Sequence, residues 1–135
     1  MEKENKLILF TDNDGKVSVN VRFADEDVWL TQEQLAQIYA TTQQNISQHV
    51  KSIYADEELS DEATHKKFLL VRQEGSRKVK REIDHYNLDM IIALSYQMDT
   101  GHSAAFRKWI INKVASKQNG ISLFIPIKSA NTYNC

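Results

Sequence analysis

The chain has 135 residues, of which 41% are hydrophobic and 26% are charged, with four glycines and one proline. This composition is typical of one globular domain and excludes a disordered or collagen-like chain. The formal net charge of −1 is unevenly distributed, because residues 24–63 hold nine acids and one base whereas residues 64–85 hold seven bases and three acids. Such asymmetry can orient a protein on a phosphate backbone.

The beginning of the sequence, MEKENKLILF, lacks the long apolar run of a signal peptide. No stretch of 18 consecutive apolar residues occurs in the sequence, so we expect no membrane span. The single cysteine, Cys135, excludes an intrachain disulfide. We therefore expect a cytoplasmic protein.

A β-hairpin is predicted first, with arms at residues 7–10 and 16–23. Val19, Val21 and Phe23 alternate with polar residues, which is the period of a half-buried strand. The connecting residues 12–15, DNDG, have turn chemistry. They do not fit a calcium loop, since with Gly15 at the sixth place Phe10 and Val21 would occupy the first and last ligand positions.

Two short helices are predicted next, joined by a tight turn. Thr31 and Gln34 form a capping-box pattern at the start of the first helix, which should end near Ala40. Thr41 or Thr42 can cap the second helix, whose buried stripe we place at residues 46, 50 and 53. The pair fits a helix-turn-helix motif, although glycine is commoner than Ala40 in the turn. A plain helical hairpin is the alternative.

The outer face of the second helix carries amide and hydroxyl side chains. Glutamine and asparagine can make two hydrogen bonds to the edge of adenine in the major groove, and serine can contact bases or phosphates. A helix face that only contacts water would more usually carry Glu and Lys. The candidate DNA-binding residues of this helix are Gln43, Gln44, Asn45, Ser47, Gln48 and Lys51.

A short polar link or irregular helix, DEELSDEATHKK, leads into a second predicted hairpin around Gly75, which should adopt a positive φ. Its bases suit contacts with backbone phosphate or the minor groove beside a recognition helix. A charged hairpin that only maintains solubility is the alternative. The candidate phosphate-binding residues are Arg77, Lys78, Lys80 and Arg81.

Two further helices complete the predicted domain. Asn87 should cap a largely apolar helix, NLDMIIALSYQM, and Ser103 should cap a last helix that buries Phe106 and Ile110. We place the domain at residues 1–115. Residues 116–135 are predicted to be an irregular C-terminal tail, which fits a truncated chain.

Catalytic or metal chemistry has little support in the sequence. The four histidines, at residues 49, 65, 85 and 102, lack the close spacing of a zinc site, and neither a glycine-rich phosphate loop nor a nucleophile-elbow pattern occurs. We expect neither an enzyme, nor a cofactor, nor a small-molecule substrate. His49 and His85 are most simply packing residues.

Three segments, in this order and spacing, resemble the RhuM-type virulence-associated proteins of bacteria: VWLTQEQLAQIYATTQQNISQHVKSIY, YNLDMIIALSYQMDT and FRKWI. The second and third also resemble, more distantly, the Bro-N and KilA-N domains of phage and large DNA viruses. The resemblance implies a DNA-binding N-terminal module. It marks as signature residues, with a structural role, Tyr86, Asn87, Leu88, Asp89, Met90, Phe106, Arg107 and Trp109.

We therefore expect an α+β domain of winged helix-turn-helix type, with an N-terminal β-hairpin, a basic hairpin and two C-terminal helices. The predicted function is sequence-specific binding of duplex DNA, in transcriptional regulation or in a virulence- or phage-related role, with a homodimer as a possible state. The alternative is a protein-interaction module that keeps the winged fold and binds through the acidic residues 56–62. Those acids would also oppose phosphate binding if they faced DNA.

Overall fold

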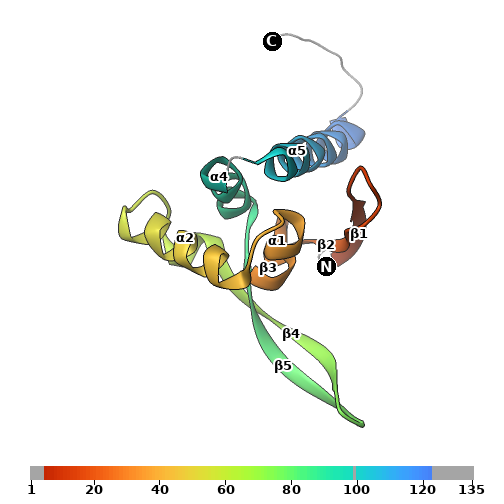
Figure 1. Cartoon of the computed structure of the whole chain (residues 1–135). Coiled ribbons are helices and arrows are strands. Elements are labelled where there is room, and N and C mark those ends of the chain that lie inside the picture. Colours follow the sequence, from red (N-terminus) through yellow and green to blue (C-terminus); the bar gives the residue numbers. More distant parts are fainter. Residues whose placement is uncertain (1–4, 99, 123–135) are drawn as a thin grey trace.

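The computed structural model describes residues 5–98 and 100–122. Within these residues, five strands form one antiparallel sheet in the order β1-β2-β3-β5-β4, and five helices accompany it. Figure 1 shows the helices gathered at one end and a long hairpin extending from the other. The elements are β1 (Asn5–Thr11), β2 (Ser18–Ala24), β3 (Asp27–Thr31), α1 (Gln32–Ile38), α2 (Gln43–Ala55), α3 (Asp61–Thr64), β4 (His65–Glu74), β5 (Arg77–Tyr86), α4 (Leu88–Met98) and α5 (Gly101–Ser122). The expected α+β class is confirmed.

The N-terminal hairpin forms as predicted from β1 and β2. The alternating residues Val19, Val21 and Phe23 are buried, while Ser18, Asn20 and Arg22 are more exposed. Gly15 has a φ of 74°, and its N–H donates to the Asp12 carbonyl, which closes the turn. Alternation therefore located this hairpin correctly.

Strand β3 was not predicted. It follows β2 through a two-residue turn in which Asp25 and Glu26 have φ values of 54° and 60°. Val28, Trp29 and Leu30 are all buried, so the strand lacks the alternation that reveals a half-buried strand. Its place between β2 and β5, with cover on both sides, explains the continuous burial.

The predicted capping box starts α1. The Thr31 Oγ1 atom accepts from the Gln34 N–H at 3.1 Å, and the Gln34 Oε1 atom accepts from the Thr31 N–H at 2.9 Å. The helix ends in a Schellman motif, in which the Thr41 N–H donates to the Ala36 carbonyl and Ala40 has a φ of 58°. Both predicted ends are thus confirmed.

Helix α2 begins at the second predicted cap. The Thr42 Oγ1 atom accepts from the Asn45 N–H at 3.0 Å. Ile46, Val50 and Ile53 are buried, as their spacing predicted. Helix α1 packs on α2, β3 and α5, and α2 packs on α4. The polar side of α2 is therefore the side that faces water.

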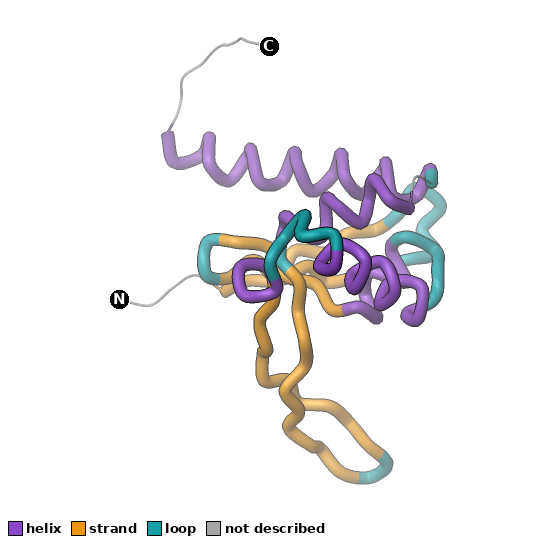
Figure 2. The backbone as a smooth tube through the Cα atoms, turned by 90° about the vertical axis from the view of Figure 1, so that its left-hand side faces the viewer, coloured by secondary structure: helices purple, strands orange, loops and turns teal. Residues whose placement is uncertain are grey.

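The second hairpin is longer than the first, and only its base packs against the rest of the protein. Strands β4 and β5 pair over ten residues each, and Gly75 in their turn has the predicted positive φ, at 65°. Only His85 and Tyr86, at its base, are buried, and β5 pairs with β3 only there. Figures 1 and 2 show the rest of the hairpin projecting beyond the helices as a two-stranded ribbon.

The last two helices differ from prediction in where α5 begins and ends. Asn87 caps α4 as expected, since its Oδ1 atom accepts from the Met90 N–H at 3.3 Å. Thr100, rather than the predicted Ser103, caps α5: the Thr100 Oγ1 atom accepts from the Ser103 N–H, and the Ser103 Oγ atom accepts from the Thr100 N–H. Ser103 thus supplies the returning half of a capping box.

The predicted division at residue 116 falls inside α5. The helix continues to Ser122. Once a helix is nucleated, further residues can extend it without an apolar stripe of their own, and such a stripe was the signal used to predict α5. The rest of the predicted irregular tail, residues 123–135, lies outside the described residues.

Candidate functional site

The outer face of α2 contains most of the predicted base-contacting residues. Gln43, Gln44, Gln48 and Lys51 are exposed, and Ser47 is partly buried. Among the described contacts, none engages these five side chains in a hydrogen bond or an ion pair. Their polar groups are therefore available to a ligand.

Asn45 differs from the other predicted residues of α2. Its Nδ2 atom donates to the Thr41 Oγ1 atom at 2.9 Å, and it lies 3.8 Å from the Met98 sulfur. The side chain thus holds the turn between α1 and α2 and contacts α4. These contacts leave only part of its hydrogen-bonding capacity for another molecule.

His49 also connects helices. Its Nδ1 atom lies 2.7 Å from the Gln97 Oε1 atom of α4. An amide oxygen only accepts, so Nδ1 carries the proton in this hydrogen bond. The interpretation of His49 as a partly buried packing residue agrees with this position.

The two faces of the β4-β5 hairpin carry different side chains, because residues paired across the strands share a face and alternate residues do not. We call the first the lysine face; it contains the pairs Lys67–Asp84, Leu69–Glu82, Val71–Lys80 and Gln73–Lys78. We call the second the arginine face; it contains the pairs Phe68–Ile83, Leu70–Arg81, Arg72–Val79 and Glu74–Arg77.

Two of the arginines are paired with carboxylates. Arg81 makes two hydrogen bonds to Glu74, at 3.1 and 2.8 Å, which raise the pKa of Arg81 and lower that of Glu74. Arg72 lies 3.5 Å from Glu33 of α1. Both pairs are exposed to water, so their contribution to stability is small. They nevertheless reduce the positive charge of the arginine face.

The other predicted phosphate-binding residues are unpaired. Arg77, Lys78 and Lys80 are exposed, and no ion pair involves them in the part of the chain that the structure describes. Sequence reasoning grouped Arg81 with these three residues. The register of β4 with β5 brings Arg81 to Glu74 and leaves the other three without a carboxylate partner among the described residues.

Two acids of the acidic stretch at residues 24–63 are engaged within the fold. The Asp27 carboxylate accepts from the N–H groups of Val28 and Leu88 and from the Asn87 side chain. Asp25 forms an ion pair with Lys66. Exposed acids remain at Glu26 and at residues 56–62, the latter near the C-terminal end of α2 and in α3, away from the Thr42 end of α2.

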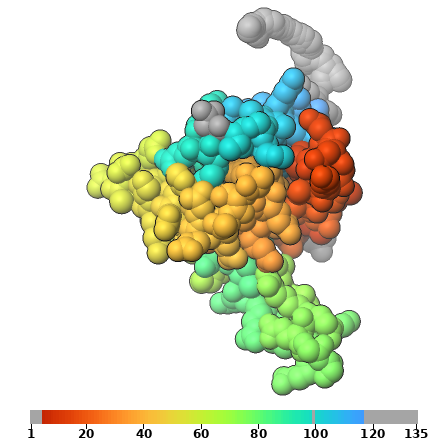
Figure 3. All heavy atoms as spheres, viewed as in Figure 1, coloured from red at the N-terminus to blue at the C-terminus, as the bar shows by residue number. Residues whose placement is uncertain are grey.

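Helix α2 and the hairpin are both uncovered on one side of the molecule. In Figure 1, α4 and α5 lie above α2, and the hairpin extends below it. The space-filling view of Figure 3 shows the yellow surface of α2 above the green hairpin, with no other element covering either from this side. One extended ligand can therefore contact both.

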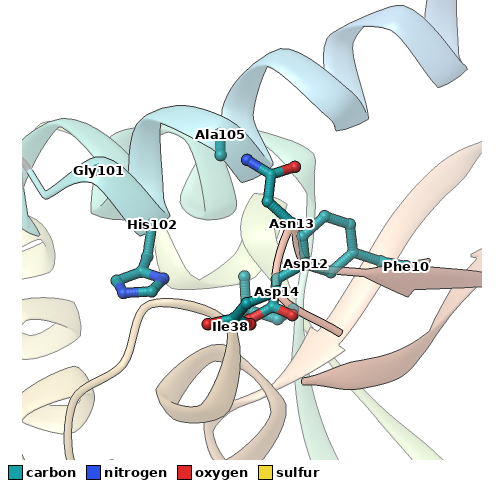
Figure 4. A pocket seen from close by; sticks show the side chains of 8 residues that line it. All are labelled: Phe10, Asp12, Asn13, Asp14, Ile38, Gly101, His102 and Ala105. Carbon is teal, nitrogen blue, oxygen red and sulfur yellow. The ribbon is translucent and has the colours of Figure 1, made fainter. Parts of the chain in front are cut away.

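A separate hollow of about 400 Å³ lies between the first turn, the end of α1 and the start of α5 (Figure 4). Its carboxylates stabilise the turn, since Asp12 accepts from the Val17 N–H and Asp14 from the Lys16 N–H. Among the described residues, no group of three or more His, Cys, Asp or Glu side chains is arranged to hold a metal ion. Also within these residues, no helix is long and apolar enough to cross a membrane.

The predicted signature residues fix α4 and α5 to the sheet. Met90 and Phe106 are fully buried, and Phe106 contacts the rings of Phe10 and Tyr39 edge-on. Arg107 donates to the Ser95 Oγ atom at 2.9 Å and lies over the Tyr96 ring. These contacts give the signature residues a structural position.

Sequence reasoning missed two exposed apolar residues, Leu69 and Val71, on the lysine face. Both were read as part of an extended arm. The signal was present in the alternation of Lys67, Leu69 and Val71, but it identifies a face only once the register with β5 is known.

The sequence model of the Virulence protein RhuM family matches residues 63–118. This stretch contains the end of α3, the hairpin, α4 and most of α5, and it supports the RhuM-type resemblance there; α1 and α2 lie outside it. This match gives no support to the more distant resemblance to Bro-N and KilA-N domains. No curated protein and no solved structure matches the chain significantly.

Proposed function

We propose that this chain is a RhuM-type DNA-binding protein in which α1 and α2 act as a helix-turn-helix and the β4-β5 hairpin acts as a wing. The observation that carries the proposal is the exposed row of amide side chains on α2, without partners among the described contacts, on a helix that lies uncovered above a basic hairpin (Figure 1). Duplex DNA presents both base edges and phosphates, which such a surface can contact together.

The chemistry of α2 suits the major groove. An α-helix fits into this groove, and glutamine can bind the N6 and N7 atoms of adenine with two hydrogen bonds. Gln44, Gln48 and Lys51 lie opposite the buried stripe of α2, with Ser47 beside them, and these four residues would face the bases. Gln43, at the first turn of the helix, would lie near a phosphate.

The connection between α1 and α2 supports a helix-turn-helix. The motif needs a small residue where the helices approach and a tight turn between them. Ala36 is buried at the approach, and the turn consists of only four residues, Tyr39 to Thr42, between the two helices. The wing would contact backbone phosphate with Arg77, Lys78 and Lys80, while Arg81 would need to leave Glu74 to do so.

The biological setting that fits is transcriptional regulation in the bacterial cytoplasm, in a virulence- or phage-related role. The support for this setting is the match of residues 63–118 to the RhuM family. A homodimer on a repeated half-site is compatible with the proposal. Selection of bound duplexes from a random pool would give the target, and half-sites about 10 base pairs apart would indicate a dimer.

The proposal is tested by titrating labelled duplex with the protein at two salt concentrations. The double variant Gln48→Ala/Lys51→Ala should bind about 10- to 100-fold more weakly, because each base contact contributes about 1–3 kcal/mol. The matched control is Lys108→Ala/Asn112→Ala, which removes an ammonium and an amide from exposed positions of α5. This control should bind as the wild type does.

Absence of salt-sensitive binding by the wild type at micromolar concentration would refute the proposal. A protein-interaction role through the acidic residues 56–62 would then become the better explanation. Equal losses of DNA affinity in the α2 variant and the α5 control would also contradict the proposal. They would show that binding depends on total charge alone.

A further inference from the structure

The hairpin is two-sided, and its two faces have different surroundings. On the arginine face, the Phe68 ring lies 5.6 Å from that of Trp29 and 5.2 Å below the Arg22 guanidinium. Further along, Arg72 contacts Glu33 of α1. This face is therefore directed towards the body of the protein along part of its length.

The charge of the arginine face is largely balanced. Of its three arginines, Arg72 and Arg81 contact Glu33 and Glu74, and Arg77 at the tip is unpaired. A phosphate that approached this face would have to displace a carboxylate from each paired arginine. The separation would cost part of the energy gained from the new contact.

The lysine face has neither feature in its outer half. Lys78 and Lys80 are exposed and without an ion pair in the described part of the chain, and the acids of this face, Glu82 and Asp84, lie nearer the base. Asp84 is itself engaged by Lys67 at 2.7 Å and by His65 at 2.7 Å. The outer half thus carries uncompensated positive charge.

Apolar side chains lie between these charges. Leu69 and Val71 are 61% and 63% exposed, and Val71 is paired directly with Lys80. Two neighbouring apolar residues this exposed on one face of a ribbon are typical of a contact surface. A second copy of the chain would bring lysine against lysine, whereas a polyanion would neutralise the charge.

We propose that the lysine face is the side of the wing that contacts DNA, and that it lies along the minor groove next to the major groove occupied by α2. Lys78 and Lys80 would bind phosphates at the edges of the groove. Leu69 and Val71 would pack against the sugars and base edges within it, as apolar side chains do in other minor-groove complexes. This inference rests on the proposed function and specifies how the wing performs it.

The sheet defines the side on which the lysine face lies at the base of the ribbon. Residues two apart in a strand share a face, so the lysine face continues through His65 and Tyr86 to the side of the sheet where Leu30 is buried under the helices. At its base the lysine face therefore lies on the helix side of the sheet, whereas further along the twisted ribbon it is the arginine face that reaches α1, through Arg72 and Glu33.

Three double variants separate the two faces. Lys78→Gln/Lys80→Gln should reduce the slope of log K against log salt by about 1.8, because each lost phosphate contact removes about 0.9. The matched control, Arg72→Gln/Arg81→Gln, removes two charges from the opposite face and should leave the slope nearly unchanged. Circular dichroism checks that each variant retains the fold of the wild type.

The apolar contact is tested by Leu69→Thr/Val71→Thr, which keeps residues compatible with a strand. This variant should bind duplex about tenfold more weakly with the slope unchanged, because it loses apolar burial and no charge. On an A·T-rich duplex, filling the minor groove with netropsin should lower the DNA affinity of the wild type more than that of this variant. No effect of netropsin on the wild type would overturn the assignment to the minor groove.

Equal reductions of slope in the lysine and arginine variants would overturn the assignment of the lysine face. The Leu69→Thr/Val71→Thr variant is also examined by sedimentation. A change in self-association with no change in DNA affinity would show that the face joins two copies, and the inference would be wrong. If the α2 variant weakens binding while all three hairpin variants bind as the wild type does, this inference fails alone; if the wild type does not bind duplex, both proposals fail.

Discussion

At the scale of single residues, Ala40 occupies a position that favours glycine. Its φ of 58° places a Cβ atom in the left-handed region, at the point where α1 ends and the turn to α2 begins. This conformation costs an alanine about 1–2 kcal/mol. The Schellman hydrogen bond from Thr41 to Ala36 holds the residue there in spite of that cost.

Ala40→Gly should therefore raise the free energy of unfolding by about 0.5–1 kcal/mol, after allowance for the greater freedom of glycine in the unfolded chain. Urea denaturation measures the change. The control is Ala104→Gly, on an exposed position inside α5, which should lower stability by about 0.5–1 kcal/mol. A loss of stability in both variants would show that Ala40 is not strained.

His85 is a buried, neutral imidazole at the base of the long hairpin. Its Nδ1–H donates to the Ile83 carbonyl at 2.8 Å, and its ring lies edge-on to Phe68. Burial lowers the pKa of His85, and the nearby Arg22 lowers it further, against the opposite effects of the hydrogen bond and of Asp84. The folded protein therefore takes up a proton at His85 only below the ordinary pKa of 6.5.

Stability should fall as the pH decreases through 6.5, because the unfolded chain binds this proton before the folded protein does. The carboxylates whose pKa values are lowered, such as Asp84 and Glu74, lose their contribution in a more acidic range. His85→Gln should show a smaller decrease in Tm between about pH 7 and pH 5 than the wild type. Identical decreases in both proteins would refute this prediction.

At the scale of elements, one carboxylate joins β3 to the start of α4. The Oδ1 atom of Asp27 accepts from the Leu88 N–H at 3.2 Å, and its Oδ2 atom accepts from Asn87 at 3.0 Å. Asn87 also donates to the Ala63 carbonyl. Asp27 therefore supplies negative charge at the N-terminus of a helix that begins far along the chain.

Asp27→Ala should lower the free energy of unfolding by about 2 kcal/mol, since it leaves donors of Leu88 and Asn87 without their acceptor. Asp27→Asn keeps one acceptor oxygen and should cost less. Glu26→Gln, at an exposed neighbouring position, serves as the control and should be close to neutral. Chemical denaturation that ranked Glu26→Gln with Asp27→Ala would contradict the capping role.

Elements that depend on neighbours in the sequence could be predicted. The capping box of Thr31 and Gln34, the cap at Asn87 and the turn at Gly75 are all formed within a few residues. Strand β3 could not, because its buried residues do not alternate and its pairing with β5 joins Leu30 to the distant Tyr86. The start of α5 was misplaced by three residues because Thr100 and Ser103 both have capping side chains.

The same distinction applies to the candidate site. The period of α2 was enough to place Gln44, Gln48 and Lys51 on its exposed side. The hairpin required its register as well, because only the pairing of the strands shows that Arg81 reaches Glu74 and that Lys80 lies beside Val71. The contact between Arg72 and Glu33 depends on the whole fold and has no local signal.

At the scale of the whole molecule, the outer half of the hairpin is separate from the core. Residues 71–80 include no buried side chain, and their contact with the body is the exposed pair of Arg72 and Glu33. Replacing residues 70–81 by the two-residue turn Asn-Gly would keep the pair Leu69–Glu82 at the new end of the ribbon.

This shortened protein should unfold within about 1 kcal/mol of the wild type, because it loses exposed pairs that contribute little. Its affinity for duplex DNA should fall by much more, if the wing acts as proposed. Urea denaturation and DNA titration of the same preparation measure both quantities. A large loss of stability would show that the ribbon supports the core.

The independence of the ribbon from the core has an evolutionary consequence. The side chains of Leu69, Val71, Lys78 and Lys80 are exposed and not packed in the core, so these residues can be substituted without destabilising the fold. The β4-β5 turn can likewise gain or lose a pair of residues while β3, α4 and α5 keep their contacts. Related chains can therefore diverge in the surface of the ribbon while inheriting the same stability.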